Sequence, residues 1–167
     1  QTETTLSIQV GTTRLNFMQS ADFQPTHYAF DIPENQFDEA KNWLTERVPL
    51  IADASGKTVF DDPTDWNTHS VYYADADGNI GELIARHNLP TASTRPFTNE
   101  SIVRVSEIGL VTPDVMQTVA DLGEHGGLDA WRGAGSDIFA AVGDETGLLI
   151  VVKEGRLWMP DMTLPAT

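Results

Sequence analysis

Two segments decide the fold of this chain: HYAFDI at residues 27–32 and VYYADADGNIGELIA at residues 71–85. The first is typical of a β-strand, because its side chains alternate between two faces. Tyr28, Phe30 and Ile32 share one apolar face, which we expect to pack on a helix. His27 and Asp31 share the other face, which therefore carries a metal-competent imidazole and a carboxylate.

The second segment is typical of a β-hairpin. The sequence DADGN at residues 75–79 favours a tight turn, because Asp begins such turns and Gly tolerates a positive φ. The strand that follows alternates, so Ile80, Glu82 and Ile84 share one face. A carboxylate between two isoleucines is costly to bury unless it is protonated, paired or bound to a metal.

An amphipathic helix is predicted between these two segments. Phe37, Ala40, Leu44 and Val48 recur at helical spacing, and Pro49 ends the pattern. A short strand is expected at 58–60, and the acidic run at 61–65 is interpreted as a solvated loop. Residues 27–86 thus follow the order strand, helix and three strands.

The same order returns later in the chain. A strand pattern at 102–111 is followed by a helix that opens at Pro113, and a hairpin pattern spans residues 140–154. Aligning the two copies places Glu107 at the position of His27 and Val151 at the position of Glu82. The later copy therefore keeps one candidate ligand and has lost the other.

These motifs resemble the vicinal oxygen chelate superfamily, which includes glyoxalase I, extradiol dioxygenases, fosfomycin-resistance thiol transferases and bleomycin-binding proteins. The resemblance implies an α+β fold in which βαβββ modules form cupped mixed β-sheets with helices on the outer faces. Residues 27–86 would be a complete module, and residues 101–158 a second, shorter one. Residues 1–20 would be the last hairpin of a first module whose earlier part precedes residue 1.

In metal-using members of this superfamily, the first and last strands of a module each supply a ligand. The resemblance therefore implies a divalent metal (Fe, Mn, Zn or Ni) held by His27 and Glu82, with Glu107 as third ligand through the internal repeat. Each residue has a simpler alternative. His27 could be a hydrogen-bonded core residue, Glu82 could pair with Arg86 or Arg104, and Glu107 could face solvent, with the third ligand coming from a strand before residue 1.

Two further residues are candidate catalytic groups. His69 precedes the hairpin and could act as an acid or base, because an unperturbed imidazole titrates near neutral pH. Tyr73 could donate its phenol to a substrate oxygen. An exposed loop position for His69 and a core position for Tyr73 are the alternatives.

The predicted function is that of a metal-dependent enzyme, a lyase, isomerase or dioxygenase, acting on a small substrate with neighbouring oxygens. Extradiol dioxygenases use two histidines and one carboxylate, and this chain departs from that set. The alternative is a metal-free, drug-sequestering protein of the bleomycin-resistance type, whose cup Trp66, Tyr73 and Trp131 would line. A homodimer could complete the cup.

Composition narrows the partners. The 167 residues carry a net charge of −15 and no cysteine. Such a charge disfavours nucleic acid and anionic membrane surfaces, and the absence of cysteine excludes disulfides and a thiolate nucleophile. No apolar run is long enough to span a bilayer. We therefore expect a cytoplasmic protein whose partner is a small molecule.

Overall fold

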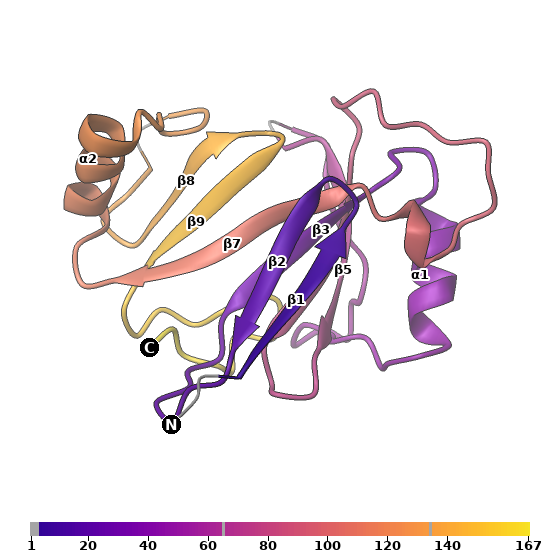
Figure 1. Ribbon diagram of the computed structural model, residues 1–167, viewed down its shortest axis with the longest axis horizontal. Coiled ribbons are helices and arrows are strands. Elements are labelled where there is room, and N and C mark those ends of the chain that lie inside the picture. Colours follow the sequence, from indigo (N-terminus) through magenta and orange to yellow (C-terminus); the bar gives the residue numbers. More distant parts are fainter. Residues whose placement is uncertain (1–3, 65, 134) are drawn as a thin grey trace.

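The computed structural model describes residues 4–64, 66–133 and 135–167 (Figure 1). Asp65, the last residue of the predicted acidic loop, lies outside these ranges. The elements, in chain order, are β1 (Thr5–Val10), β2 (Thr13–Met18), β3 (His27–Ile32), α1 (Phe37–Thr45), β4 (Phe60–Asp62), β5 (Thr68–Ala74), β6 (Ile80–Arg86), the 3-10 turn η1 (Asn99–Ser101), β7 (Arg104–Thr112), α2 (Val115–Gly126), β8 (Phe139–Asp144) and β9 (Gly147–Lys153).

Seven strands form one curled mixed sheet in the order β4-β5-β6-β3-β7-β9-β8. Each half contains one parallel pair, β3 with β6 and β7 with β9, and the antiparallel pair β3–β7 joins the halves. The crossovers carry α1 and α2, which lie at opposite ends of the molecule (Figure 1). The predicted α+β fold with a cupped mixed sheet and flanking helices is confirmed.

The two faces of β3 are used as its alternation predicts. Tyr28, Phe30 and Ile32 are buried in one core cluster with Ala40 and Leu44 of α1. In the other half of the sheet, residues of β8 and β9 pack with Val115 under α2. The opposite face of the sheet is therefore left for the cup.

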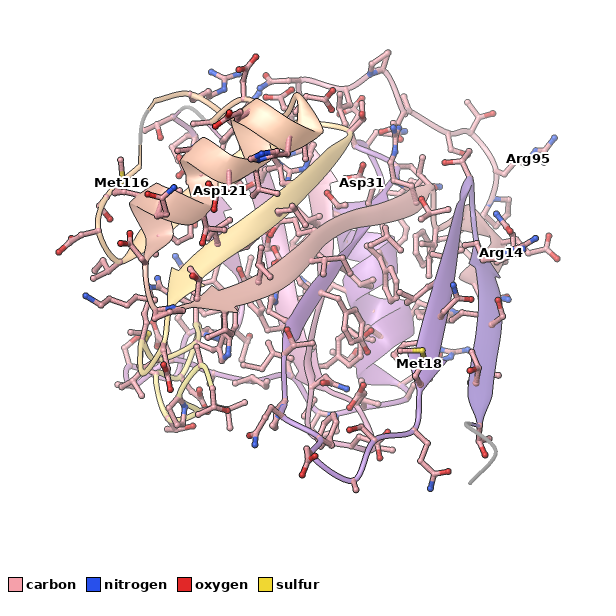
Figure 2. The ribbon with its side chains drawn as sticks, turned by 60° about the vertical axis from the view of Figure 1, so that its left-hand side comes forward. Arg14, Met18, Asp31, Arg95, Met116 and Asp121 are labelled. Atoms are coloured by element: carbon pink, nitrogen blue, oxygen red, sulfur yellow. The ribbon has the colours of Figure 1, made fainter. Side chains whose placement is uncertain are left out.

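The β1–β2 hairpin packs on the helix-bearing face instead of extending the sheet. The Phe17 ring meets the Tyr28 ring edge-on, with centroids 6.2 Å apart. The Thr12 amide donates to the Val103 carbonyl at 3.0 Å. Gly11 is required at this contact, because its φ is +51° and a Cβ there would lie 1.9 Å from the Val103 oxygen. Figure 2 shows Arg14 and Met18 on this hairpin, far from Met116 and Asp121 on α2, with Asp31 between them.

Two boundaries differ from those predicted, and the segment after β9 is an addition to the cup. Helix α1 ends at Thr45 rather than Val48, since the position before Pro49 disfavours helical backbone. The edge strand β4 covers residues 60–62, so the prediction that this part of the acidic run is a loop was wrong: Asp61 pairs with His69 of β5. The apolar tail docks inside the cup, where Trp158 is buried against β6 and β9.

Neither helix in the described ranges combines the length and the apolarity needed to cross a bilayer.

Candidate metal centre

The sheet register brings His27, Glu82 and Glu107 together. Ala29 of β3 is paired on one side with Glu82 of β6 and on the other with Glu107 of β7. His27, two residues before Ala29 on the same strand, projects from the same face. Its Nε2 lies 3.4 Å from Glu82 Oε2 and 3.3 Å from Glu107 Oε2. One ligand atom from each residue lies within 4.8 Å of the other two.

In the second copy, the position that corresponds to Glu82 is apolar. In the first copy, Glu82 is paired with Ala29, the residue two positions after His27. In the second copy, the residue two positions after Glu107 is Gly109, and it is paired with Ile150 of β9. The repeat position equivalent to Glu82 is thus Ile150, and the prediction of Val151 was wrong by one residue because the second hairpin has a tighter turn. Ile150 lines the cup, whereas Val151 is buried under α2.

Burial and mutual charge perturb the pKa values of the three candidate ligands in different directions. Burial, followed by the charge of Glu107, raises the pKa of Glu82 to about 7. Burial also opposes ionisation of Glu107, but its hydrogen bond to His27 and the nearby Arg86 prevail and lower its pKa. For His27, burial alone would lower the pKa, yet the hydrogen bond that it donates to Glu107 and the two carboxylate charges raise it. The site therefore strongly favours positive charge between the carboxylates.

Arg86 binds the Glu107 carboxylate oxygen that does not face His27. This arginine is 1% exposed, and its Nη2 donates to Glu107 Oε1 while its Nε donates to Ser106 Oγ at 3.0 Å. Arg86 Nε also lies 3.6 Å from Asp31, which Arg104 contacts at 3.1 Å. The arginine that the sequence offered as a partner for Glu82 thus pairs with Glu107.

An aromatic cavity of about 390 Å³ opens above the three ligands. The rings of Tyr72 and Trp158 lie near the His27 ring, with centroids 6.2 and 5.9 Å away from it. The remaining aromatic lining comes from Phe60, Trp66 and Phe139. A small planar or apolar ligand would therefore contact several rings, and the charged side chains of Lys57, Asp61, Asp62 and Arg156 also line the cavity.

The structure does not bring His69 or Tyr73 to this cavity. Both lie on the other face of β5, where Tyr73 packs in the α1 core and His69 contacts Phe37 and His87. We leave them out of the function proposed below. Of the aromatic residues predicted for a metal-free cup, Trp66 lines the cavity and Trp131 packs on Trp66 with centroids 4.4 Å apart.

Tyr72 and Ser70 are the site residues that the sequence reasoning missed. Tyr72 pairs with Glu82 across the hairpin, and Ser70, on the same face of β5, lines the same cavity. Counting residues outward from the turn would have identified them, because antiparallel partners project from the same face.

The donor set fits a divalent transition metal. One imidazole and two carboxylates suit Fe, Mn, Zn or Ni, and all three side chains are buried. Arg86 engages only Oε1 of Glu107, which leaves Oε2 directed at the same point as the other two donors. Support of a ligand by a hydrogen bond from behind is characteristic of metal sites.

The sequence matches no protein-family model, and no curated protein gives a significant match. Several solved structures share the fold. One is a candidate dioxygenase from Bacillus subtilis subsp. subtilis str. 168, with 17% identity and a TM-score of 0.55, covering 84% of this chain and 46% of that chain. Another is a single-residue variant of glyoxalase I from Zea mays, with 16% identity and a TM-score of 0.52, covering 84% and 48%.

This chain thus spans about half the length of the solved structures that it matches. Their identity is low, so the likeness concerns the arrangement of strands and helices. It has the fold of the vicinal oxygen chelate superfamily, as the motifs at 27–32 and 71–85 predicted.

Proposed function

We propose that this protein is a metal-dependent enzyme that acts on a small molecule with two neighbouring oxygens. The observation that carries the proposal is the convergence of His27, Glu82 and Glu107 on the floor of a cavity with aromatic walls. Three protein ligands leave positions open for a substrate, as in catalytic metal sites. When bound, the ion would supply Lewis acidity toward the substrate oxygens.

The three ligands have different roles in this proposal. Arg86 orients Glu107 and keeps it ionised, so Glu107 serves only to hold the ion. Glu82 lies in the cavity with the hydroxyl-bearing residues Tyr72 and Ser70, whereas Arg86 pairs with Glu107. A carboxylate oxygen of Glu82 is therefore the group best placed to accept a proton from a substrate carbon or hydroxyl. Tyr72 would keep that carboxylate oriented during the transfer.

The cavity walls would bind and shield the substrate. Trp158 and Tyr72 line the cavity beside the imidazole, and His27 itself is buried. The aromatic lining suits catechols and apolar compounds with an adjacent hydroxyl and carbonyl. Excluding water strengthens the electrostatic interactions between the floor and the substrate oxygens.

Metal content of the purified full chain tests the proposal. After exposure to Fe²⁺, Mn²⁺, Zn²⁺ or Ni²⁺ and desalting, the wild type should retain one equivalent more than His27→Ala or Glu107→Gln. The matched control is His125→Ala, an exposed histidine at the end of α2. Equal metal retention in wild type and His27→Ala at this site would refute the proposal. Loss of metal should also abolish turnover of a catechol or hydroxy-carbonyl panel.

The metal-free binding protein is the second candidate. The observation that favours it is the internal compensation of charge, in which Arg86 and His27 already face the two carboxylates. Metal-free protein that binds an aromatic ligand with unchanged affinity in His27→Ala would support this function over catalysis. Light scattering of the same samples tests the homodimer that the superfamily resemblance implies.

A further inference from the structure

A second polar cluster lies on the opposite side of the sheet from the cup. His69 and Ser70 are consecutive on β5 and project from opposite faces, so Ser70 lines the cup while His69 lines a separate cavity beside α1. His87, directly after β6, and Glu34, just before α1, line the same cavity. Three segments distant in sequence thus meet here.

The ring nitrogens of the two histidines face each other. His69 Nδ1 lies 2.7 Å from His87 Nε2, and the rings are nearly perpendicular, at 81°. On its other side, His87 Nδ1 lies 3.3 Å from Glu34 Oε2. A carboxylate accepts from that nitrogen, so the Nδ1 of His87 carries the proton and its Nε2 presents a lone pair toward His69.

This arrangement is the one that metal-ligating histidines adopt. Such a histidine donates its second ring N–H to a carboxylate, which fixes the tautomer and the ring orientation. Glu34 is itself anchored, since its amide donates to Thr91 Oγ1 at 3.1 Å, and the His87 amide donates to the Asn67 carbonyl at 3.0 Å. Glu34 and His87 are therefore each held in place by a hydrogen bond from their own backbone amide.

The distances fit a shared ion after a small adjustment. Two imidazole nitrogens about 2.05 Å from a tetrahedral Zn²⁺ are roughly 3.3 Å apart, so the present pair would have to separate by about 0.6 Å. Both histidines are half-buried at the mouth of a cavity, where side-chain rotation can supply this movement. The exposed carboxylates of Asp38 and Glu39 line the same cavity, and Glu39 adds negative charge beside the open positions, whereas Asp38 is paired with Lys41 at 3.0 Å.

We propose that His69 and His87, with Glu34 supporting His87, form a second site for a transition-metal ion such as Zn²⁺ or Ni²⁺. Imidazole donors select these ions over Mg²⁺ and Ca²⁺. The net charge of −15 raises the local concentration of cations. The ion would link the start of α1, strand β5 and the segment after β6. This site is independent of the function proposed for the cup.

The test uses the full chain with ZnCl₂ or NiCl₂ alone, in a His27→Ala background that removes the cup site. Calorimetric titration of the chelator-treated protein should give one remaining equivalent. Adding His69→Asn or His87→Asn should weaken that binding at least 10-fold, and Glu34→Gln should weaken it about 10- to 100-fold by releasing the His87 ring. His125→Asn, whose Nδ1 faces only a backbone carbonyl of its own helix, is the control and should change nothing.

Nitrogen-detected NMR of the histidine rings provides a direct readout. The ring signals of His69 and His87 should shift with one equivalent of Zn²⁺, and that of His125 should stay in place. A His27→Ala protein that binds no ion, or one whose binding survives His69→Asn, would overturn the second site and show a plain hydrogen-bonded pair. Glu82→Gln is the alternative background if His27→Ala unfolds. Because the cup is disabled in either background, failure at one site is distinguishable from failure at the other.

Discussion

Replacing Arg86 with methionine should strongly destabilise the protein. Arg86 is the cation that compensates two buried acids, Glu107 and Asp31, and it is itself 1% exposed. Methionine keeps a similar length and removes the charge and its hydrogen bonds. Glu107 would then retain only His27 as a counter-charge, and Asp31 would retain only Arg104.

The size of the effect follows from burial. Removing one partner of a buried ion pair costs about 3–5 kcal/mol, because the remaining charge is left without compensation. The free energy of unfolding of a domain is about 5–15 kcal/mol, so the loss is a large fraction of the total. With a urea m-value of about 2 kcal/mol/M, the unfolding midpoint should fall by about 1.5–2.5 M.

Urea unfolding in chelator-containing buffer, followed by tryptophan fluorescence, measures this loss. The control is Arg104→Met, in which Asp31 keeps Arg86 and the cost should be about 1–2 kcal/mol. In the double variant Arg86→Met/Glu107→Gln the unpaired carboxylate is neutral, so the two losses should be non-additive by about 1–3 kcal/mol. A loss below about 1 kcal/mol in Arg86→Met, or equal losses for both arginines, would show that Arg86 is not a buried counter-ion.

The remaining predictions concern pH, metal affinity and helix α2. Burial, opposed by the two arginines, raises the pKa of Asp31 from 3.8 to about 6, so its stabilising contribution is complete below pH 4 and lost as the pH rises through 6. Each unit of difference in pKa is worth about 1.4 kcal/mol, and a small part of the loss already occurs below pH 4, so wild type should lose about 2–2.5 kcal/mol relative to Asp31→Asn between pH 4 and 7; parallel urea profiles would contradict this. Ile150→Glu should tighten metal binding at the cup at least 10-fold by supplying a fourth ligand, whereas the neutral Ile150→Gln should not. An unchanged affinity of Ile150→Glu in calorimetry would refute the assignment of Ile150 to the position that corresponds to Glu82. Asp114→Ala should cost about 1 kcal/mol in urea unfolding with metal content unchanged, since its side chain caps α2 by accepting from an amide at 3.0 Å; no loss would mean that the cap is dispensable.

The sequence correctly predicted how side chains alternate between the two faces of a single strand. The period of two placed Tyr28, Phe30 and Ile32 against α1 and left His27 facing the cup. The same rule applied across the hairpin would have identified Tyr72 in place of Tyr73, because position 72 is the antiparallel partner of Glu82. Tyr73, one residue further along β5, projects from the opposite face and packs in the core beside α1.

The alignment of the two copies could not predict which residues of neighbouring strands are paired in the sheet. Aligning the two copies on their turn glycines assigned Val151 to the position of Glu82, whereas the pairing of β7 with β9 assigns Ile150. For a related reason, Arg86 was expected as a partner of Glu82, whereas it pairs with Glu107. Which acid a buried arginine contacts depends on strands that neighbour each other in the sheet and lie far apart in the chain.

The amino-acid sequence alone determined the order of elements, the polar face of each strand and the donor types at His27, Glu82 and Glu107. These properties are local, since side-chain alternation and turn chemistry act over a few residues. Only the tertiary structure decided that the three donors share one point, that Arg86 stands behind Glu107, and that His69 meets His87 outside the cup. The reason is physical: convergence depends on strand order and register, which arise from the packing of the whole sheet.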